Sequence, residues 1–333
     1  MTPQARWQTW QARFPWLRWW ETTLTATGPL SLIAVFFLLP AFWPGLGEGQ
    51  PAQQLADPEG AFITVDGVEL YYIHSAVPGA TPVVFVHGFG GSTVDWEHIL
   101  PRVAAAGYDA YALDLPGFGL SEKGLDLNLG HPAQADSIAA WMAALELDAA
   151  HIVGHSMGGS IALHLAQRHP ERVHSLGLVA PSLVGAETAG LPEALTESEL
   201  IQRWTELLLA WVLPASAEIQ LRSAAYRDEA ITEELVEDYR RVFETEGWEL
   251  SLLAVGRDAG QNVLEAPLSS ITAPVALLWG AEDGWVPPSE GDRLQAALPN
   301  AERITFEEVG HLPMHEIPTE FTQALLTFWA SLD

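Results

Sequence analysis

The most constraining feature of this 333-residue chain is a serine flanked by glycines, between an expected strand and an expected helix. The apolar run HIVG (151–154) precedes Ser156, and the helical pattern SIALHLAQRHP follows the segment GHSMG (154–158). This segment fits G-x-S-x-G, in which a sharp strand-to-helix turn exposes the serine oxygen. Side chains at Gly154 or Gly158 would collide with neighbours, and the helix N-terminus favours developing negative charge. The pattern therefore predicts a nucleophilic serine.

A second glycine-rich loop, HGFGGS (87–92), follows the strand-like run PVVFV, and His87 and Gly88 open it. Acyl transfer needs two backbone N–H donors aimed at the place where a carbonyl oxygen becomes anionic. We expect the N–H groups of Phe89 and Met157 to form this oxyanion hole, one from each loop. A plain glycine-rich turn is the alternative interpretation of this segment.

A serine hydroxyl needs a base, and the base needs a carboxylate that orients it. His311 follows the last expected strand, AERITF, and is the candidate base, with His315 as the nearest alternative. Asp283 follows the expected strand PVALLWG and is the candidate acid, with Glu282 as the alternative. Loops at the C-terminal ends of parallel strands are where such sheets place their ligands. The sequence therefore predicts that Ser156, Asp283 and His311 form a catalytic triad.

Beyond residue 60, short apolar runs alternate with helical patterns. Such alternation implies an α/β fold, with a largely parallel sheet covered by helices on both faces. Residues 182–266 break the alternation, because they contain helical patterns and no buried strand. We interpret them as an inserted helical cap, or lid, on a core formed by residues 61–181 and 267–333.

Two tryptophans and a leucine recur within the first helical pattern of the cap, ELIQRWTELLLAWVL. Trp204, Leu208 and Trp211 are expected to pack in the interior of the cap rather than contact substrate. Other cap residues are expected to line the substrate pocket.

The formal net charge of −28 excludes some partners. Residues 1–57 are balanced, so the acidic excess lies on residues 58–333. Such a surface repels nucleic acid and anionic lipid, and we predict no nucleic-acid role. Adaptation for solubility or salt tolerance is the simpler explanation of the charge. The chain has no cysteine, which excludes disulfides and thiolate metal sites.

Residues 1–60 form a tryptophan-rich segment, a charge-free stretch (24–43) and a linker rich in glycine and proline. Twenty helical residues would cover about 30 Å, roughly the hydrocarbon core of a bilayer. We expect a membrane anchor, and the three arginines before it place the N-terminus in the cytoplasm and the catalytic domain outside. A cleaved signal peptide, giving a secreted protein, and a helix that docks on a soluble protein are the alternatives.

Five motifs together give the chain a clear resemblance to the α/β-hydrolase superfamily, from about residue 61 to residue 333. In chain order they are HGFGGS (87–92), DLPGFGLS (114–121), GHSMGG (154–159), GAEDGWVP (280–287) and GHLPMHE (310–316). The resemblance implies a sheet of about eight strands with a lid after the sixth, and neither a metal nor an organic cofactor. The order serine, aspartate, histidine is the order of this fold.

Within the superfamily, Ser156 argues against haloalkane dehalogenases and epoxide hydrolases, which use an aspartate nucleophile. GHSMGG resembles the corresponding segment of carboxylesterases, monoacylglycerol lipases and carbon–carbon bond hydrolases of aromatic ring cleavage. We favour an esterase or lipase that acts on a small, uncharged acyl ester. A carbon–carbon bond hydrolase is the first alternative, and a catalytically silent binding module is the second.

Overall fold

A computed structural model describes residues 49–183, 190–192 and 196–332 of the chain. The predicted membrane anchor (24–43) lies outside the described residues. Within them, no helix combines the length and the apolar character that crossing a bilayer requires.

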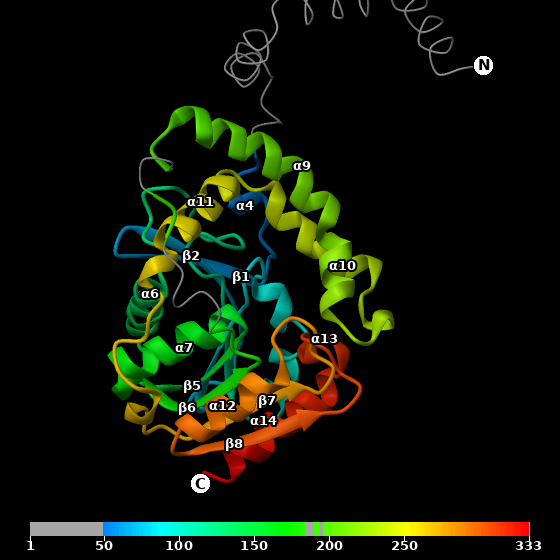
Figure 1. Cartoon of the computed structure of the whole chain (residues 1–333). Helices are drawn as coiled ribbons and strands as arrows, with labels where there is room; N and C mark the ends of the chain where they lie inside the picture. The colour runs from blue at the N-terminus through cyan, green and yellow to red at the C-terminus, as the bar shows by residue number, and fades with distance from the viewer. Residues whose placement is uncertain (1–48, 184–189, 193–195, 333) are drawn as a thin grey trace, which may run out of the picture.

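The centre of the molecule is an eight-stranded sheet with the strand order β1-β2-β4-β3-β5-β6-β7-β8 (Figure 1). β2 pairs antiparallel with β1 and β4, and all other neighbours are parallel. The strands are β1 (Gly60–Val65), β2 (Val68–Ser75), β3 (Pro82–Val86), β4 (Asp109–Leu113), β5 (Ala150–His155), β6 (Val173–Val179), β7 (Val275–Gly280) and β8 (Ala301–Phe306). Every residue of β5 and β7 is buried, because helices cover both faces of a parallel sheet.

Two hydrophobic clusters pack against opposite faces of the sheet. Trp141 of α6 and Ile161 of α7 belong to one cluster, and Val103 of α5 and Phe321 of α14 belong to the other. The α-helices are α4 (Ala52–Leu55), α5 (Leu100–Ala105), α6 (His131–Ala144), α7 (Met157–Arg168), α9 (Glu199–Ala224), α10 (Glu233–Arg241), α11 (Trp248–Asp258), α12 (Pro288–Ala297), α13 (Pro313–Glu316) and α14 (Pro318–Ala330). The fold class predicted from strand–helix alternation is confirmed.

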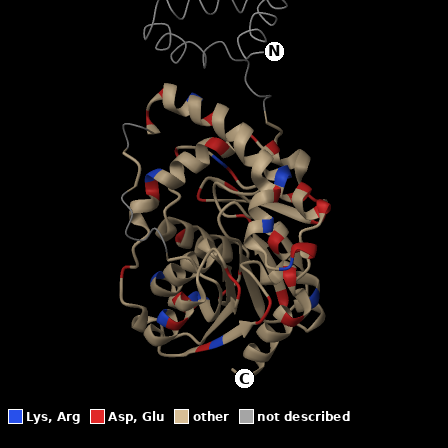
Figure 2. Ribbon diagram, turned by 45° about the vertical axis from the view of Figure 1, so that its right-hand side comes forward, with Lys and Arg blue, Asp and Glu red and all other residues tan. Residues whose placement is uncertain are grey.

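Between β6 and β7 the described chain is helical, and α9, α10 and α11 lie together at one end of the molecule (Figure 1). The expectation that Leu208 and Trp211 pack inside this layer is wrong, because their side chains on α9 are 56% and 63% exposed. Their spacing matches an apolar helix face, but that face points to solvent. Acidic side chains outnumber basic ones along the ribbon of both the core and the helical layer (Figure 2).

Candidate active site

Ser156 occupies a strained turn between the end of β5 and the start of α7. Its backbone has φ 51° and ψ −115°, a conformation that costs a non-glycine residue about 1–3 kcal/mol. Hydrogen bonds maintain it: the Ser156 N–H donates to Val179 O at 2.8 Å, and the Ser182 N–H donates to Ser156 O at 3.0 Å. The surrounding strands therefore impose the turn that exposes the serine.

The glycines around Ser156 allow backbones to approach one another without a side chain between them. A Cβ at Gly154 would lie 2.4 Å from Gly158 O, and a Cβ at Gly158 would lie 2.4 Å from His87 O. A Cβ at Gly88 would lie 3.2 Å from the Cβ of Ser156. The loop after β3 is therefore in direct contact with the serine turn.

His311 and Asp283, which are distant in sequence, form a buried pair. His311 Nδ1 is 2.7 Å from Asp283 Oδ2, and the two side chains are 2% and 0% exposed. The other carboxylate oxygen accepts the N–H groups of Trp285 at 2.8 Å and Val286 at 2.9 Å. The ring of Trp285 also stacks on His311, with centroids 5.6 Å apart. Asp283 therefore orients the imidazole and leaves Nε2 as the atom able to take a proton.

The two alternative candidates have other partners. His315 Nε2 lies 3.6 Å from Asp95 Oδ1, and Glu282 accepts the N–H of Val309 at 3.0 Å. The histidine that contacts Asp283 is therefore His311, and His315 contacts a different carboxylate.

His155, adjacent to Ser156 in the sequence, supports the backbone of His311. Its Nε2 donates to His311 O at 2.9 Å, and the N–H of His311 donates to Ala224 O at the end of α9. Burial, together with the nearby charge of His311, lowers the pKa of His155 to about 3. His155 is therefore neutral near pH 7 and acts as a fixed donor.

Glu316 anchors the same loop from its other side. The Glu316 carboxylate accepts the N–H of Gly310 at 3.0 Å and that of Leu312 at 3.2 Å, on either side of the histidine. It also accepts the N–H groups of Tyr226 and Arg227, both at 2.9 Å, just after α9. One buried carboxylate thus joins the histidine loop to the helical layer.

Ser156 and His311 border one cavity of about 390 Å³, the serine cavity. Among the described residues, no hydrogen bond joins the Ser156 hydroxyl to His311. In ligand-free enzymes such bonds are often long and tighten when substrate binds. The structure therefore brings Ser156 and His311 to one cavity and pairs His311 with Asp283 directly.

The loop that carries Phe89 is fixed by His87. His87 Nδ1 donates to Gly88 O at 2.7 Å, while its Nε2 accepts the N–H of Leu115 at 3.0 Å. Phe89 lines the serine cavity, and Met157 begins α7 directly after the serine. Neither the Phe89 N–H nor the Met157 N–H donates a hydrogen bond within the part of the chain that the structure describes. Both donors are thus available to an oxygen bound beside Ser156.

The serine cavity is mainly apolar. Its aliphatic and aromatic lining includes Phe118, Leu213, Ala217, Leu221, Leu252 and Val286. Lys123 is the only lysine or arginine among the described residues that border it. The Lys123 ammonium donates to Gly119 O at 2.6 Å and Ser121 O at 3.0 Å, and burial lowers its pKa to about 8.

One buried carboxylate, Asp95, also borders this cavity. Burial opposes its ionisation, but His315 and the hydrogen bond from the Tyr239 hydroxyl outweigh burial and lower the pKa of Asp95. The described residues contain no group of three or more histidine, cysteine, aspartate or glutamate side chains placed to hold a metal ion.

Several residues that shape the site have no role that the sequence alone predicts. Glu316 and Trp285 fall within the motifs GHLPMHE and GAEDGWVP, so their positions were visible although their contacts were not. Asp95 and Tyr239 had no such signal, because their partnership joins a loop of the core to α10.

Comparisons with known proteins identify the family of the chain. The sequence profile of a family described as alpha/beta hydrolase fold matches residues 81–318. The chain is 31% identical to the uncharacterized hydrolase YugF of Bacillus subtilis (strain 168) over 265 residues, which cover 80% of this chain and 96% of that protein. It is 29% identical to a 2-hydroxy-6-oxononadienedioate/2-hydroxy-6-oxononatrienedioate hydrolase of Cupriavidus pinatubonensis, over 80% of this chain and 94% of that protein.

Among solved structures, a membrane phospholipase A described as a bacterial virulence factor superposes with a TM-score of 0.65. It is 26% identical, and the match covers 94% of this chain and 98% of that one. The profile match spans most of the sheet and the segments that carry the three candidate residues. The prediction of a hydrolase is confirmed at this level, and the chain belongs to the α/β hydrolase fold family.

Proposed function

We propose that this hydrolase cleaves carboxylic esters through an acyl-enzyme on Ser156. The Ser156 hydroxyl gives its proton to His311 Nε2 while its oxygen bonds to the ester carbonyl carbon. The N–H groups of Phe89 and Met157 stabilise the resulting oxyanion. Asp283 stabilises the imidazolium, which then protonates the departing alcohol as its C–O bond breaks. Water, deprotonated by His311, releases the acid and restores the serine.

The observation that carries this proposal is that His311, which borders the same cavity as Ser156, forms a buried pair with Asp283. A histidine held at Nδ1 by a fully buried carboxylate is suited to take a proton at Nε2. The strained backbone of Ser156 supports the same role, because strain of this kind concentrates at functional sites.

The Cupriavidus relative, whose name is that of a dienedioate and trienedioate hydrolase, makes a carbon–carbon bond hydrolase the second candidate. The name of the Cupriavidus relative describes substrates with two carboxylates. Burying a carboxylate without a cationic partner is costly. In the serine cavity, Lys123 is directed to two backbone carbonyls and Asp95 adds a negative charge. The cavity therefore favours an uncharged ester over a dicarboxylate.

Hydrolysis of p-nitrophenyl esters from acetate to palmitate tests the proposal. Ser156→Ala should lower turnover by roughly a thousandfold or more. A fluorophosphonate probe should label the wild-type chain and not this variant. Turnover of a ring-cleavage dienedioate, with no hydrolysis of any ester in the series, would replace the ester proposal by the second candidate. A folded wild-type chain that resists the probe would instead indicate the silent binding module.

We also propose that residues 24–43 anchor the enzyme in a membrane, with its catalytic domain on the side opposite the cytoplasm. The support is the charge-free sequence itself, with three arginines before it and none closely after it. Full-length protein should remain in the membrane fraction after a carbonate wash, and protease added from the outside should reach the catalytic domain. Release by carbonate would contradict the anchor.

A further inference from the structure

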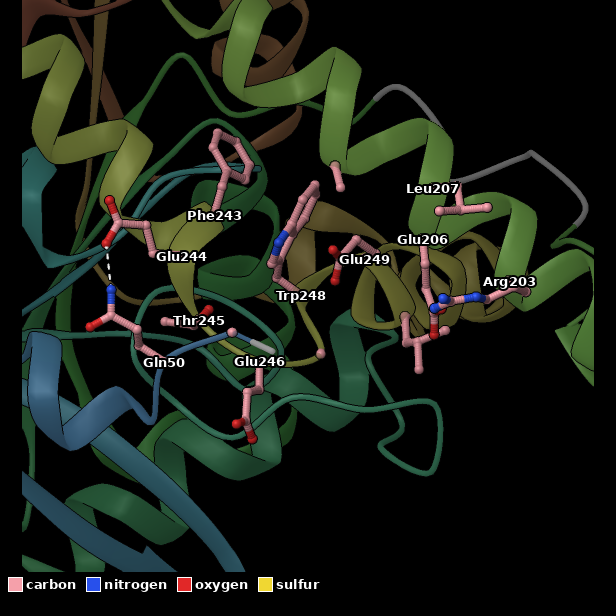
Figure 3. Close-up of a pocket in the computed structure, with 14 residues that line it drawn as sticks. Gln50, Arg203, Glu206, Leu207, Phe243, Glu244, Thr245, Glu246, Trp248 and Glu249 are labelled. Atoms are coloured by element: carbon pink, nitrogen blue, oxygen red, sulfur yellow. Dashed lines mark hydrogen bonds and ion pairs between the residues drawn. The ribbon is translucent and has the colours of Figure 1, made fainter. Parts of the chain in front are cut away.

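A second cavity, of about 760 Å³, lies next to the serine cavity. It is bordered by α9, by the turn that joins α10 to α11, and by Gly49 and Gln50 near the start of the described chain (Figure 3). Phe243 and Trp248 line both cavities. These two side chains therefore stand between the chamber that contains Ser156 and a larger one.

The two rings form a single packed unit. The rings of Phe243 and Trp248 are 4.7 Å apart between centroids and meet edge to face at 61°. Only 4% of Trp248 is exposed, although the residue borders two cavities. Rings in this arrangement attract one another in addition to the free energy of burial, so the contact stabilises the position of both side chains.

The chemistry on the two sides of the rings differs. The serine cavity is mainly apolar, whereas four glutamates border the second cavity: Glu206, Glu244, Glu246 and Glu249. Arg203 is the only lysine or arginine among the described residues that border this second cavity. Arg203 pairs with Glu206 at 2.7 Å, and burial raises the pKa of Glu249. The rings thus separate a mainly apolar chamber from one that carboxylates border.

We propose that the Phe243–Trp248 pair is a partition between the two cavities and sets the longest acyl chain that the enzyme accepts. This inference rests on the proposed ester hydrolysis at Ser156. With the partition in place, an acyl chain ends against the rings inside the apolar cavity. Without the indole, the two cavities join, and a longer chain gains room beyond its former end.

Chain-length profiles on p-nitrophenyl esters test the partition. Trp248→Ala should raise kcat/KM for laurate and palmitate relative to butyrate by roughly ten- to hundredfold, in the range that pocket contacts give to substrate discrimination. Phe243→Ala, at a less buried position, should shift the profile in the same direction. Trp211→Ala removes an indole that lines neither cavity, and it should keep the wild-type profile.

A second substitution identifies the space that the longer chain uses. Ala210 lines only the second cavity, so Ala210→Trp should occupy part of it without changing the profile of the wild-type chain. Added to Trp248→Ala, it should reduce the gain on palmitate. Thermal unfolding of each variant shows whether it folds, and Phe243→Ala carries the test if Trp248→Ala does not.

The outcomes separate the two proposals. If wild type hydrolyses esters but Trp248→Ala and Phe243→Ala keep its chain-length profile, the partition is refuted and the esterase stands. A gain on palmitate that Ala210→Trp leaves undiminished would also refute the partition, because the chain would then not enter the second cavity. If wild type hydrolyses no ester, the proposed function fails, and the inference fails with it.

Discussion

Replacing Glu316 by glutamine should destabilise the enzyme and impair catalysis together. The carboxylate accepts four backbone N–H groups, from Gly310, Leu312, Tyr226 and Arg227. A glutamine has one acceptor oxygen, and its NH₂ group would face two of these donors. Hydrogen bonds to a charged group contribute about 1.5–3 kcal/mol each, so losing two predicts a loss of about 3–6 kcal/mol. Because the loop holds His311, kcat should also fall, by roughly ten- to hundredfold.

Urea unfolding of Glu316→Gln and kcat on p-nitrophenyl butyrate measure the two effects. Glu307→Gln is the matched control, because Glu307 is exposed on the same loop region after β8. The control should unfold and react like wild type. A loss of stability below about 1 kcal/mol in Glu316→Gln, with unchanged kcat, would show that this carboxylate does not anchor the loop.

Three further substitutions test other features. Glycine adopts positive φ without a side-chain clash, so Ser156→Gly should be more stable than Ser156→Ala in urea unfolding. The free energy of unfolding should differ by about 1 kcal/mol after the entropy cost of glycine, and neither variant should be active. Equal stabilities would contradict the strain at Ser156. Asp283→Asn keeps an oxygen that accepts the N–H groups of Trp285 and Val286, but it turns an NH₂ group toward His311. We therefore expect kcat to fall roughly 10³–10⁴-fold. A near-normal kcat would show that the contact between residue 283 and His311 is not needed for catalysis. Burial lowers the pKa of His131 to about 4. As pH falls below about 6.5, the imidazole is protonated in the unfolded chain but stays neutral in the folded chain, so the folded state loses stability. Between about pH 7.5 and about pH 5, His131→Gln should lose about 2 kcal/mol less than wild type in urea unfolding, and parallel losses would show that His131 is not buried as neutral.

The core of the fold could be predicted because its signals are local. Each buried strand, such as VALLWG (275–280), is a short apolar run beside a helical pattern, and the parallel arrangement follows from that alternation. The orientation of α9 could not be predicted in this way. Trp211 has the spacing of a buried helix face, but which face is covered depends on segments distant in the chain.

The sequence likewise predicts some features of the candidate site and not others. Ser156, Asp283 and His311 each follow an expected strand, so the topology alone predicts that they lie at one edge of the sheet. Contacts across elements had no such signal. Phe243 and Trp248 lie in a helical segment whose sequence pattern is that of any amphipathic helix. Only the folded structure shows that these two rings lie between two cavities.

The attachment of Gln50 to the turn before α11 matters for shortened forms of this enzyme. Gln50 donates its backbone N–H to Glu244 O at 2.7 Å and its side-chain amide to the Glu244 carboxylate at 3.0 Å. A form that begins at residue 58 would keep every group that handles the proton, yet it would lose the tether on the turn directly after Phe243. Its substrate selectivity should therefore differ from that of a form that begins at residue 49. A substrate screen on the shorter form would find an active enzyme with altered selectivity.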